Sequence, residues 1–250
     1  MMILNRYDYN RQNGTYYGVG YNLLEHGSFD KIDVTLLKQL LDLRRSQYGN
    51  GVIAIDGGAN IGVHTIEWAR HMIDWGYVIS IEAQERIFYA LAGNIALNNC
   101  FNARALNAAL GNIQGNIKIP VPDYTKPASF GSLELIQSPH NENIGQNIDY
   151  SLDLLTDVAM LTIDSFNLPR LDLLKIDVEG MEFEVLEGAK ESLKNLKPII
   201  FIEHLKVGKE NLANYLQSID YIHFDAGINF VAIHKYDEIA EILSKSFQNQ

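Results

Sequence analysis

In Val52-Ile-Ala-Ile-Asp-Gly-Gly-Ala-Asn-Ile-Gly62, four consecutive apolar residues lead into an aspartate and a cluster of glycines. A short, nearly uninterrupted apolar run of this kind is typical of a strand that is buried on both faces. Three further runs have a similar form, and each also ends in a carboxylate: residues 78–82, 173–177 and 199–203. Because the carboxyl ends of parallel strands meet at one edge of a sheet, we expect these carboxylates to line that edge.

Segments with the apolar period of an α-helix separate these runs, so strands and helices alternate along the chain. The expected helices lie at residues 33–48, 63–73, 88–95, 183–193, 212–219 and 239–247. Near the end of the chain, the strand-like residues 221–225 and 228–234 are separated by Ala-Gly alone, which predicts a hairpin. We therefore predict an α/β fold with a doubly wound, mostly parallel sheet, one antiparallel strand and helices on both faces.

The chain of 250 residues is long enough for one large domain with short flanking segments. We expect a helical lead-in at residues 1–50 that packs on the main domain, the main domain itself at 51–236, and a C-terminal helix at 237–250. Residues 123–157 are rich in Ser, Asn, Pro and Gly, and they are too many for a simple connection. We expect them to form an irregular, lid-like insertion or to be partly disordered.

Composition excludes several classes of protein. No apolar stretch approaches the roughly 20 residues that a transmembrane helix needs, so no membrane span is expected. The formal net charge of −11, from 20 basic and 31 acidic residues, opposes binding to a phosphate backbone, so nucleic acid is not an expected partner. The first residues show no secretory signal pattern, which predicts a cytoplasmic protein. Cys100, the single cysteine, can form no disulfide within the chain.

The glycine turn after the first strand is suited to a ligand, because glycines allow a tight turn and a close approach of the backbone. The helix that begins near Gly62 presents free N–H groups to a carboxylate or a phosphate. Glu82, 20 residues further on, ends the next strand, where a carboxylate can accept hydrogen bonds from two ribose hydroxyls. These features predict an adenosine-containing cofactor. The candidate cofactor-binding residues are Asp56, Gly57, Gly58, Ala59, Asn60, Gly62, Thr65, Glu82, Ala83 and Asn107.

S-adenosylmethionine fits this turn better than a dinucleotide does. The dinucleotide fingerprint has a third glycine where this chain has Ala59. Asp56 would repel a pyrophosphate, whereas it can accept hydrogen bonds from the ammonium group of a methionine moiety. Thr65 is placed to cap the helix or to contact the methionine carboxylate, and Asn107 to contact adenine or to form a turn. A nicotinamide-dependent oxidoreductase remains the alternative.

Five segments in order carry a family resemblance. They are Asp-Gly-Gly-Ala-Asn-Ile-Gly-Val-His-Thr (56–65), Ile-Glu-Ala-Gln (81–84), Leu-Thr-Ile-Asp-Ser-Phe (161–166), Lys-Ile-Asp-Val-Glu-Gly-Met-Glu (175–182) and Ile-Glu-His (202–204). Together they resemble the FkbM family of S-adenosylmethionine-dependent methyltransferases, over roughly residues 27–233. The resemblance implies a class I methyltransferase (Rossmann-like) fold with a seven-stranded sheet, in which residues 51–236 form the methyltransferase domain.

The resemblance also implies O-methylation of a hydroxyl on a sugar, glycan or secondary metabolite. The expected partner is then a small-molecule or carbohydrate acceptor. Gln84 departs from the family, in which a proline often follows at this place in a Glu-Pro pair. We expect this departure to affect only the turn after the ribose-binding carboxylate.

Carboxylates at the other strand ends predict the chemistry. Methyl transfer to an alcohol requires alignment of the two reacting groups and removal of a proton. The first and fourth strands flank the switch point of a doubly wound sheet, which places Asp177 opposite the reactive end of the cofactor. The candidate catalytic residues are Asp177, Glu179, Glu203 and His204.

Two roles are open for this group. His204 or Asp177 can act as a general base, or Asp177, Glu179 and Glu203 can bind a divalent cation that lowers the pKa of the acceptor hydroxyl. His64 is treated as a helix residue alone. A non-catalytic domain, which binds the cofactor and contacts a protein partner through residues 123–157, is a further alternative.

Overall fold

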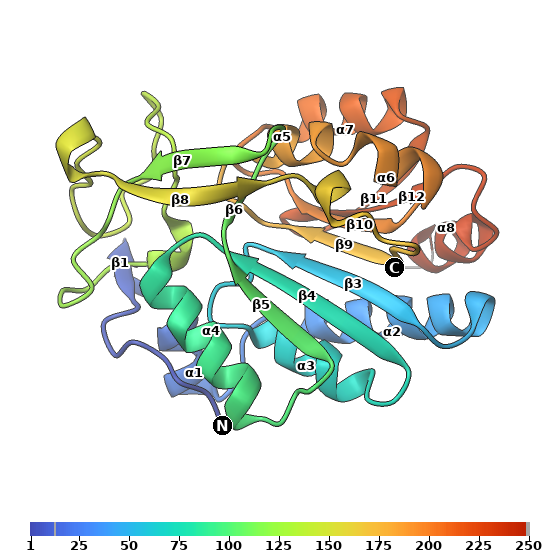
Figure 1. Ribbon diagram of the computed structural model, residues 1–250, viewed down its shortest axis with the longest axis horizontal. Helices are drawn as coiled ribbons and strands as arrows, with labels where there is room; N and C mark the ends of the chain where they lie inside the picture. The colour runs from blue at the N-terminus through green and yellow to red at the C-terminus, as the bar shows by residue number, and fades with distance from the viewer. Residues whose placement is uncertain (13, 249–250) are drawn as a thin grey trace.

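A seven-stranded sheet forms the centre of the molecule (Figure 1). The computed structural model describes residues 1–12 and 14–248, with side chains as far as Ser244. The strands of the sheet are β3 (Val52–Gly57), β4 (Gly76–Glu82), β5 (Ala103–Asn107), β9 (Leu173–Ile176), β10 (Ile199–Glu203), β11 (Tyr221–Ala226) and β12 (Asn229–His234). Their order is β11-β12-β10-β9-β3-β4-β5.

Each neighbouring pair of strands is parallel except the two pairs that β12 makes with β10 and β11. The predicted sheet, mostly parallel with one antiparallel strand, is therefore confirmed. The chain runs from β3 outward through β4 to β5, then returns to β9 on the other side of β3. The carboxyl ends of β3 and β9 therefore flank the switch point, where ligands bind in folds of this type.

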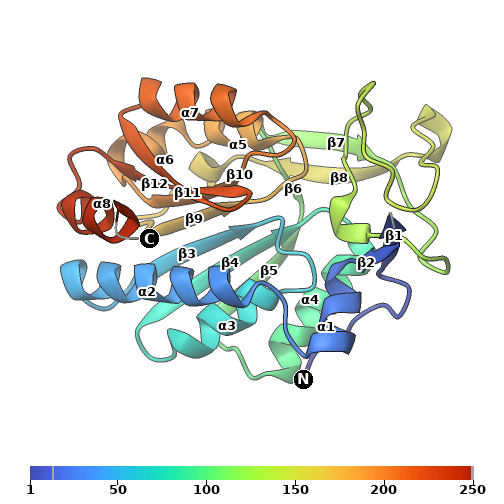
Figure 2. The ribbon, with the colours of Figure 1, turned by 180° about the vertical axis from the view of Figure 1, so that it is seen from behind.

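Helices cover both faces of the sheet, as predicted. They are α1 (Val19–His26), α2 (Lys31–Tyr48), α3 (Val63–His71), α4 (Glu85–Leu97), α5 (Glu182–Glu187), α6 (Lys190–Asn195), α7 (Lys209–Ser218) and α8 (Ala240–Gln248). Figures 1 and 2 show α2, α3 and α4 on one side of the sheet and α5, α6 and α7 on the other. The first face buries Leu37 and Trp68, and the second buries Leu186 and Leu212. Phe247, expected on the closing helix, lies outside the residues whose side chains are described.

The helix expected at 183–193 is two short helices, α5 and α6. They separate at Gly188, where a Cβ atom would lie 2.1 Å from the carbonyl oxygen of Gly111. The carboxylate of Asp164, from an earlier part of the chain, then caps the start of α6. It accepts hydrogen bonds from the backbone N–H groups of Glu191 and Ser192. Close packing against a neighbouring loop therefore interrupts a continuous apolar stripe.

Ile73, expected on the inner face of the third helix, is 59% exposed. Helix α3 ends at His71, and Met72 follows it with a fully buried side chain. Since Met72 lies four residues after the buried Trp68, it continues the inner face and Ile73 turns outward.

The sequence analysis did not predict a second, three-stranded sheet. Its strands are β6 (Ala109–Leu110), β7 (Gly115–Ile119) and β8 (Thr156–Leu161), in the order β6-β8-β7. Figure 1 shows β7 and β8 extending away from the main sheet above the carboxyl ends of its strands. Residues 120–155 connect β7 to β8 and contain no strand, so β8 takes residues 156 and 157 from the predicted insertion.

The connecting segment 120–155, here called the insertion, has a small apolar core of its own. Ala128, Phe130, Leu133 and Ile144 are buried together against the first turn of α4 and the glycine turn. Two short 3₁₀ helices, η1 (Phe130–Ser132) and η2 (Leu152–Leu154), lie within it. Among the helices of the described residues, none combines the length and the apolar character of a membrane span.

Candidate active site

A cavity of about 1440 Å³ opens at the carboxyl ends of β3, β4, β9 and β10. Its walls come from the glycine turn, the ends of these strands, the α1–α2 connection, the insertion and the β11–β12 turn. The predicted residues that line it are Gly58, Ala59, Asn60, Glu82, Ala83, Asp177, Glu179 and Glu203. The topology therefore brings together most of the residues that the sequence singled out.

The glycine turn packs closely between the carboxyl ends of β4 and β9. Gly58 has φ +70°, and a Cβ atom on it would lie 1.7 Å from the carbonyl oxygen of Asp177. The backbone N–H groups of Gly58 and Ala59 both donate to the carbonyl of Ile81, at 3.1 and 2.9 Å. Position 58 therefore admits no side chain, and the turn is fixed between β4 and β9.

Glu82 projects from the end of β4 into the cavity, although its side chain is almost wholly buried. Its two oxygens accept hydrogen bonds from the backbone N–H groups of Asn60, at 2.9 Å, and Gln84, at 2.8 Å. Burial raises the pKa of Glu82 to about 7, and these two hydrogen bonds oppose the rise. The carboxylate is thus oriented for further donors from the cavity side.

The cavity wall contains neither Asp56 nor Thr65, and it also lacks Gly57 and Gly62, so the structure does not support the cofactor contacts expected of these four residues. Asp56 is fully buried and accepts a hydrogen bond of 2.6 Å from the Thr65 hydroxyl, which also lies 2.7 Å from Ser80 Oγ. Asp56 is paired in register with Lys175 of β9, and its carboxylate lies 3.5 Å from the Lys175 ammonium. Asp56 and Thr65 therefore support the glycine turn from within the core.

Lys175 is a residue that the sequence analysis missed as a separate element of the site. Its ammonium contacts Asp177 at 3.1 Å and the Gly58 carbonyl at 3.4 Å. Burial lowers its pKa, but the carboxylates of Asp177 and Asp56 raise the pKa above its ordinary value. Lys175 therefore stays charged and joins β3, β9 and the glycine turn.

Asn107 ends β5 at the expected place, but its amide is used within the protein. The amide donates hydrogen bonds to the carbonyls of Glu82, at 2.9 Å, and Ala83, at 3.1 Å. Its side chain does not line the cavity, whereas the next residue, Ala108, does. Of the two roles left open, this geometry favours the turn-forming one.

Asp177, Glu179 and Glu203 converge at the other end of the cavity. One carboxylate oxygen from each lies within 4.8 Å of the others. Burial raises the pKa of Glu203 to about 8, and burial with the nearby charges of Asp177 and Glu203 raises the pKa of Glu179. We call these three residues the carboxylate triad.

His204 does not belong to this cluster, so the structure gives no support to its expected role as a general base. Successive residues at the end of a strand point to opposite faces, and Glu203 faces the cavity together with Phe201. The His204 ring instead packs on Phe230, with 4.9 Å between the ring centroids. It is absent from the cavity wall.

His64 takes a more prominent place than the sequence indicated. It lies in the first turn of α3 and lines the cavity, with its ring 5.6 Å from that of Trp68. Its Nε2 atom is buried and has no hydrogen-bond partner among the described residues. Burial lowers the pKa of His64 to about 4, so the ring is neutral at pH 7. Its position two residues after Gly62 was the sequence signal that could have indicated a place in the cavity wall.

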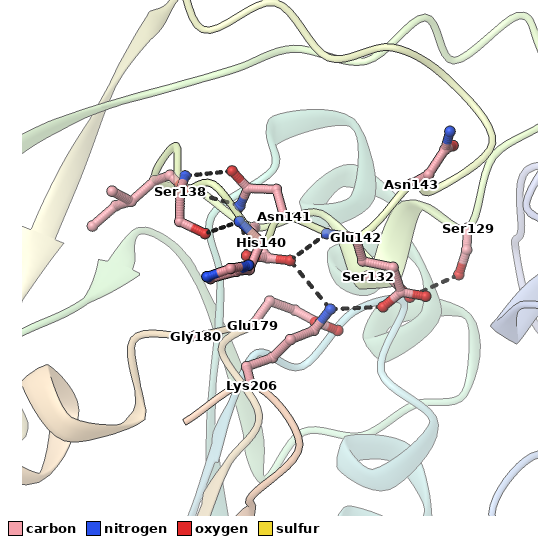
Figure 3. Close-up of polar contacts among 12 residues, drawn as sticks. Ser129, Ser132, Ser138, His140, Asn141, Glu142, Asn143, Glu179, Gly180 and Lys206 are labelled. Carbon is pink, nitrogen blue, oxygen red and sulfur yellow. Dashed lines mark hydrogen bonds and ion pairs between the residues drawn. The ribbon is translucent and has the colours of Figure 1, made fainter. Parts of the chain in front are cut away.

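The insertion is tied to the site at two points. Gln84 donates to the carbonyl of Phe130 at 2.8 Å and accepts from the Tyr124 hydroxyl at 3.0 Å. Lys206, just after β10, pairs with Glu142 at 2.6 Å (Figure 3). It also pairs with Glu134 at 3.2 Å. Gln84 therefore does more than shape a turn, because it holds the insertion beside Glu82.

Acidic residues at the start of α2 also reach the cavity and were not predicted. Asp30 and Asp33 line it, and Asn229 donates a hydrogen bond of 3.3 Å to Asp33. Burial and the charge of Asp33 raise the pKa of Asp30 to about 6. No sequence motif marks these two positions, which depend on how α2 packs against the sheet.

Comparison with known proteins identifies the family. The sequence model of the family described as the methyltransferase FkbM domain matches residues 56–245. The chain belongs to the FkbM methyltransferase family. This match spans both ends of the cavity, from the glycine turn to the residues beyond β10, and it favours a methyltransferase over the nicotinamide alternative.

Individual relatives of this FkbM chain are distant. Methyltransferase sdnD of Sordaria araneosa is 26% identical over 60% of this chain and 64% of its own, and Methyltransferase 1 of Beauveria bassiana is 24% identical over 60% and 63%. The chain thus spans just under two thirds of the curated relatives it matches. A crystal structure of an FkbM methyltransferase from Methylobacillus flagellatus has a TM-score of 0.51 at 16% identity, covering 74% of this chain and 43% of that one. This likeness confirms the class I methyltransferase fold.

Proposed function

We propose that this FkbM-family chain transfers the methyl group of S-adenosylmethionine to a hydroxyl of a sugar, glycan or secondary metabolite. One observation carries the proposal: a single cavity joins the Glu82 carboxylate at one end to the carboxylate triad at the other. The glycine turn lies between them. An adenosine-binding end and a proton-accepting end are the two parts that methyl transfer to an alcohol requires.

The residues present fit the cofactor. Glu82 would accept hydrogen bonds from the ribose hydroxyls, because its buried carboxylate already faces the cavity. The side-chain-free backbone at Gly58 leaves room for the methionine part beside the turn. When bound, S-adenosylmethionine supplies an electrophilic methyl group on a sulfonium ion.

The chain's own residues would orient the acceptor and take up its proton. Asp177 and Glu203 line the cavity opposite Glu82, where a carboxylate can orient the acceptor hydroxyl and accept its proton. The cavity of about 1440 Å³ exceeds the roughly 300–1000 Å³ that a single small ligand occupies. It therefore has room for a cofactor and an acceptor together.

The activity is tested with radiolabelled S-adenosylmethionine and pools of sugars, glycans and hydroxylated metabolites. We expect label to enter a hydroxyl-containing compound, and Glu203→Gln to slow transfer by about 10²-fold or more while cofactor affinity is kept. Asp225→Asn, near the end of β11, is the matched control, because this exposed carboxylate pairs with Lys209, and it should retain the rate. Cofactor binding without transfer to any pool would instead favour the non-catalytic interaction domain.

Cofactor binding should depend on pH through Glu82. Ribose hydroxyls donate to the ionised carboxylate, and the ionised fraction rises as the pH passes the Glu82 pKa of about 7. Since only that fraction binds well, affinity for S-adenosylhomocysteine should increase about tenfold between pH 6 and pH 8. Calorimetry at both pH values measures it. Glu82→Gln should bind weakly with little pH dependence, and an unchanged pH profile in this variant would reject the assignment.

A further inference from the structure

The carboxylate triad holds more negative charge than the neighbouring described residues compensate. Asp177, at the end of β9, Glu179, two residues later, and Glu203, at the end of β10, bring one oxygen each to within 4.8 Å of the others. Like charges at such distances repel one another strongly in a partly buried site. A positive group between them would remove that repulsion.

Glu203 carries the inference furthest. Its side chain is 8% exposed and faces the cavity, yet its carboxylate has no hydrogen bond or ion pair with any residue that the structure describes. Glu179 adds a second buried oxygen, because no described residue donates a hydrogen bond to its Oε2 and the ion pair of this atom with Lys206 is long, at 3.7 Å. Buried carboxylates are ordinarily paired or bound to a metal ion. Here, among the described residues, Glu203 has no such partner, and Glu179 has a long ion pair with Lys206.

The two nearest lysines each contact one member of the triad, but both are shared with carboxylates outside it. Lys175 lies between Asp56 and Asp177. Lys206 pairs with Glu134 and Glu142 of the insertion, and its ammonium stays 3.7 Å from Glu179 (Figure 3). Neither lysine forms an ion pair with Glu203 in the described structure. The two lysines therefore offset part of the charge of Asp177 and Glu179 and leave Glu203 without an ion pair.

The local backbone conformation directs the Glu179 side chain toward Asp177 and Glu203. Glu179 has φ +55°, a left-handed conformation that a glutamate rarely adopts. Glu182 holds this turn, because its carboxylate accepts hydrogen bonds from the backbone N–H groups of Val178 and Gly180. The loop after β9 is thus fixed on both sides of Glu179, which presents its carboxylate to the same space as Glu203.

We propose that Asp177, Glu179 and Glu203 bind one divalent cation of the oxygen-preferring class, such as Mg²⁺ or Mn²⁺. Three carboxylates without a cysteine or histidine form a donor set that suits these ions rather than zinc. The role of the ion rests on the proposed function: at the acceptor end of the cavity it would lower the pKa of a hydroxyl bound beside it. Its binding does not require the cofactor.

Titration of the full chain with Mn²⁺, followed by electron paramagnetic resonance after treatment with EDTA and dialysis, tests the site without cofactor or acceptor. We expect one equivalent to bind, and Glu203→Gln and Asp177→Asn each to weaken binding at least tenfold. Asp225→Asn is the control, since this carboxylate also lines the cavity but is 62% exposed and pairs with Lys209. Its Mn²⁺ affinity should equal that of the wild type.

Thermal unfolding gives a second readout. Mn²⁺ should raise the Tm of the wild type and of Asp225→Asn, but not that of Glu203→Gln, whose Tm without metal should be at least that of the wild type. Absence of Mn²⁺ binding at millimolar concentration, or equal binding by Glu203→Gln, would overturn the proposal. S-adenosylhomocysteine binding in EDTA is measured separately, so loss of that binding alone would contradict the proposed function and leave the cation site standing.

Discussion

Gly58→Ala is expected to lower the free energy of unfolding by about 3 kcal/mol and to abolish measurable cofactor binding. Two costs add at this position. A non-glycine residue at φ +70° is strained, and its Cβ atom would lie 1.7 Å from the backbone oxygen of Asp177. Since that oxygen is part of the chain following β9, relief requires the glycine turn and β9 to separate. Urea denaturation gives the free energy, and calorimetry gives the affinity.

Gly27→Ala separates the two costs. Gly27 has φ +66°, but a Cβ atom there would have no neighbour within 4 Å. This control should lose only the conformational part, about 1 to 2 kcal/mol, and should bind cofactor normally. If both variants lost the same stability and Gly58→Ala still bound cofactor, the close approach of the turn to β9 would be wrong.

Lys175→Met is expected to lower the free energy of unfolding by about 3 to 5 kcal/mol. Lys175 is almost wholly buried beneath the glycine turn, and its ammonium faces the fully buried carboxylate of Asp56. Methionine keeps most of the side-chain volume but leaves that carboxylate without its countercharge. The loss should therefore come from an unpaired buried charge rather than from a cavity.

Two variants check this explanation by urea denaturation. Lys209→Met removes an exposed lysine that pairs with Asp225, and it should cost at most about 1 kcal/mol. The double variant Asp56→Asn with Lys175→Met removes both charges and should recover much of the lost stability. A double variant as unstable as the sum of its single changes would show that Asp56 and Lys175 act independently.

The main fold could be predicted because its signals are local. Four apolar runs ending in acidic residues and the helical stripes between them specify buried parallel strands and their connections. The second sheet gave no comparable signal. Strand β6 has two residues, and β7, Gly-Asn-Ile-Lys-Ile, is largely exposed, so neither has a buried apolar face of useful length.

The sequence predicted the site residues whose place depends on the position of the backbone at a strand end. It missed those whose place depends on the direction of the side chain. Glu82 and Glu203 end strands and project into the cavity as expected. Asp56 has the same kind of position, but Lys175 opposite it in the sheet binds it within the core. Strand alternation alone places Glu203 and His204 on opposite faces, so the position of His204 away from the cavity wall could have been predicted. The reach of Lys206 depends on tertiary packing, which local patterns do not encode.

Binding of S-adenosylhomocysteine to the full chain, measured by titration calorimetry at pH 8, is the most direct test of the central claim. Wild type should bind one equivalent, and Glu82→Ala should bind at least tenfold more weakly with its fold intact by circular dichroism. Absence of heat at millimolar ligand in the wild type, or equal affinity in the two proteins, would contradict the assignment of this cavity as an S-adenosylmethionine site.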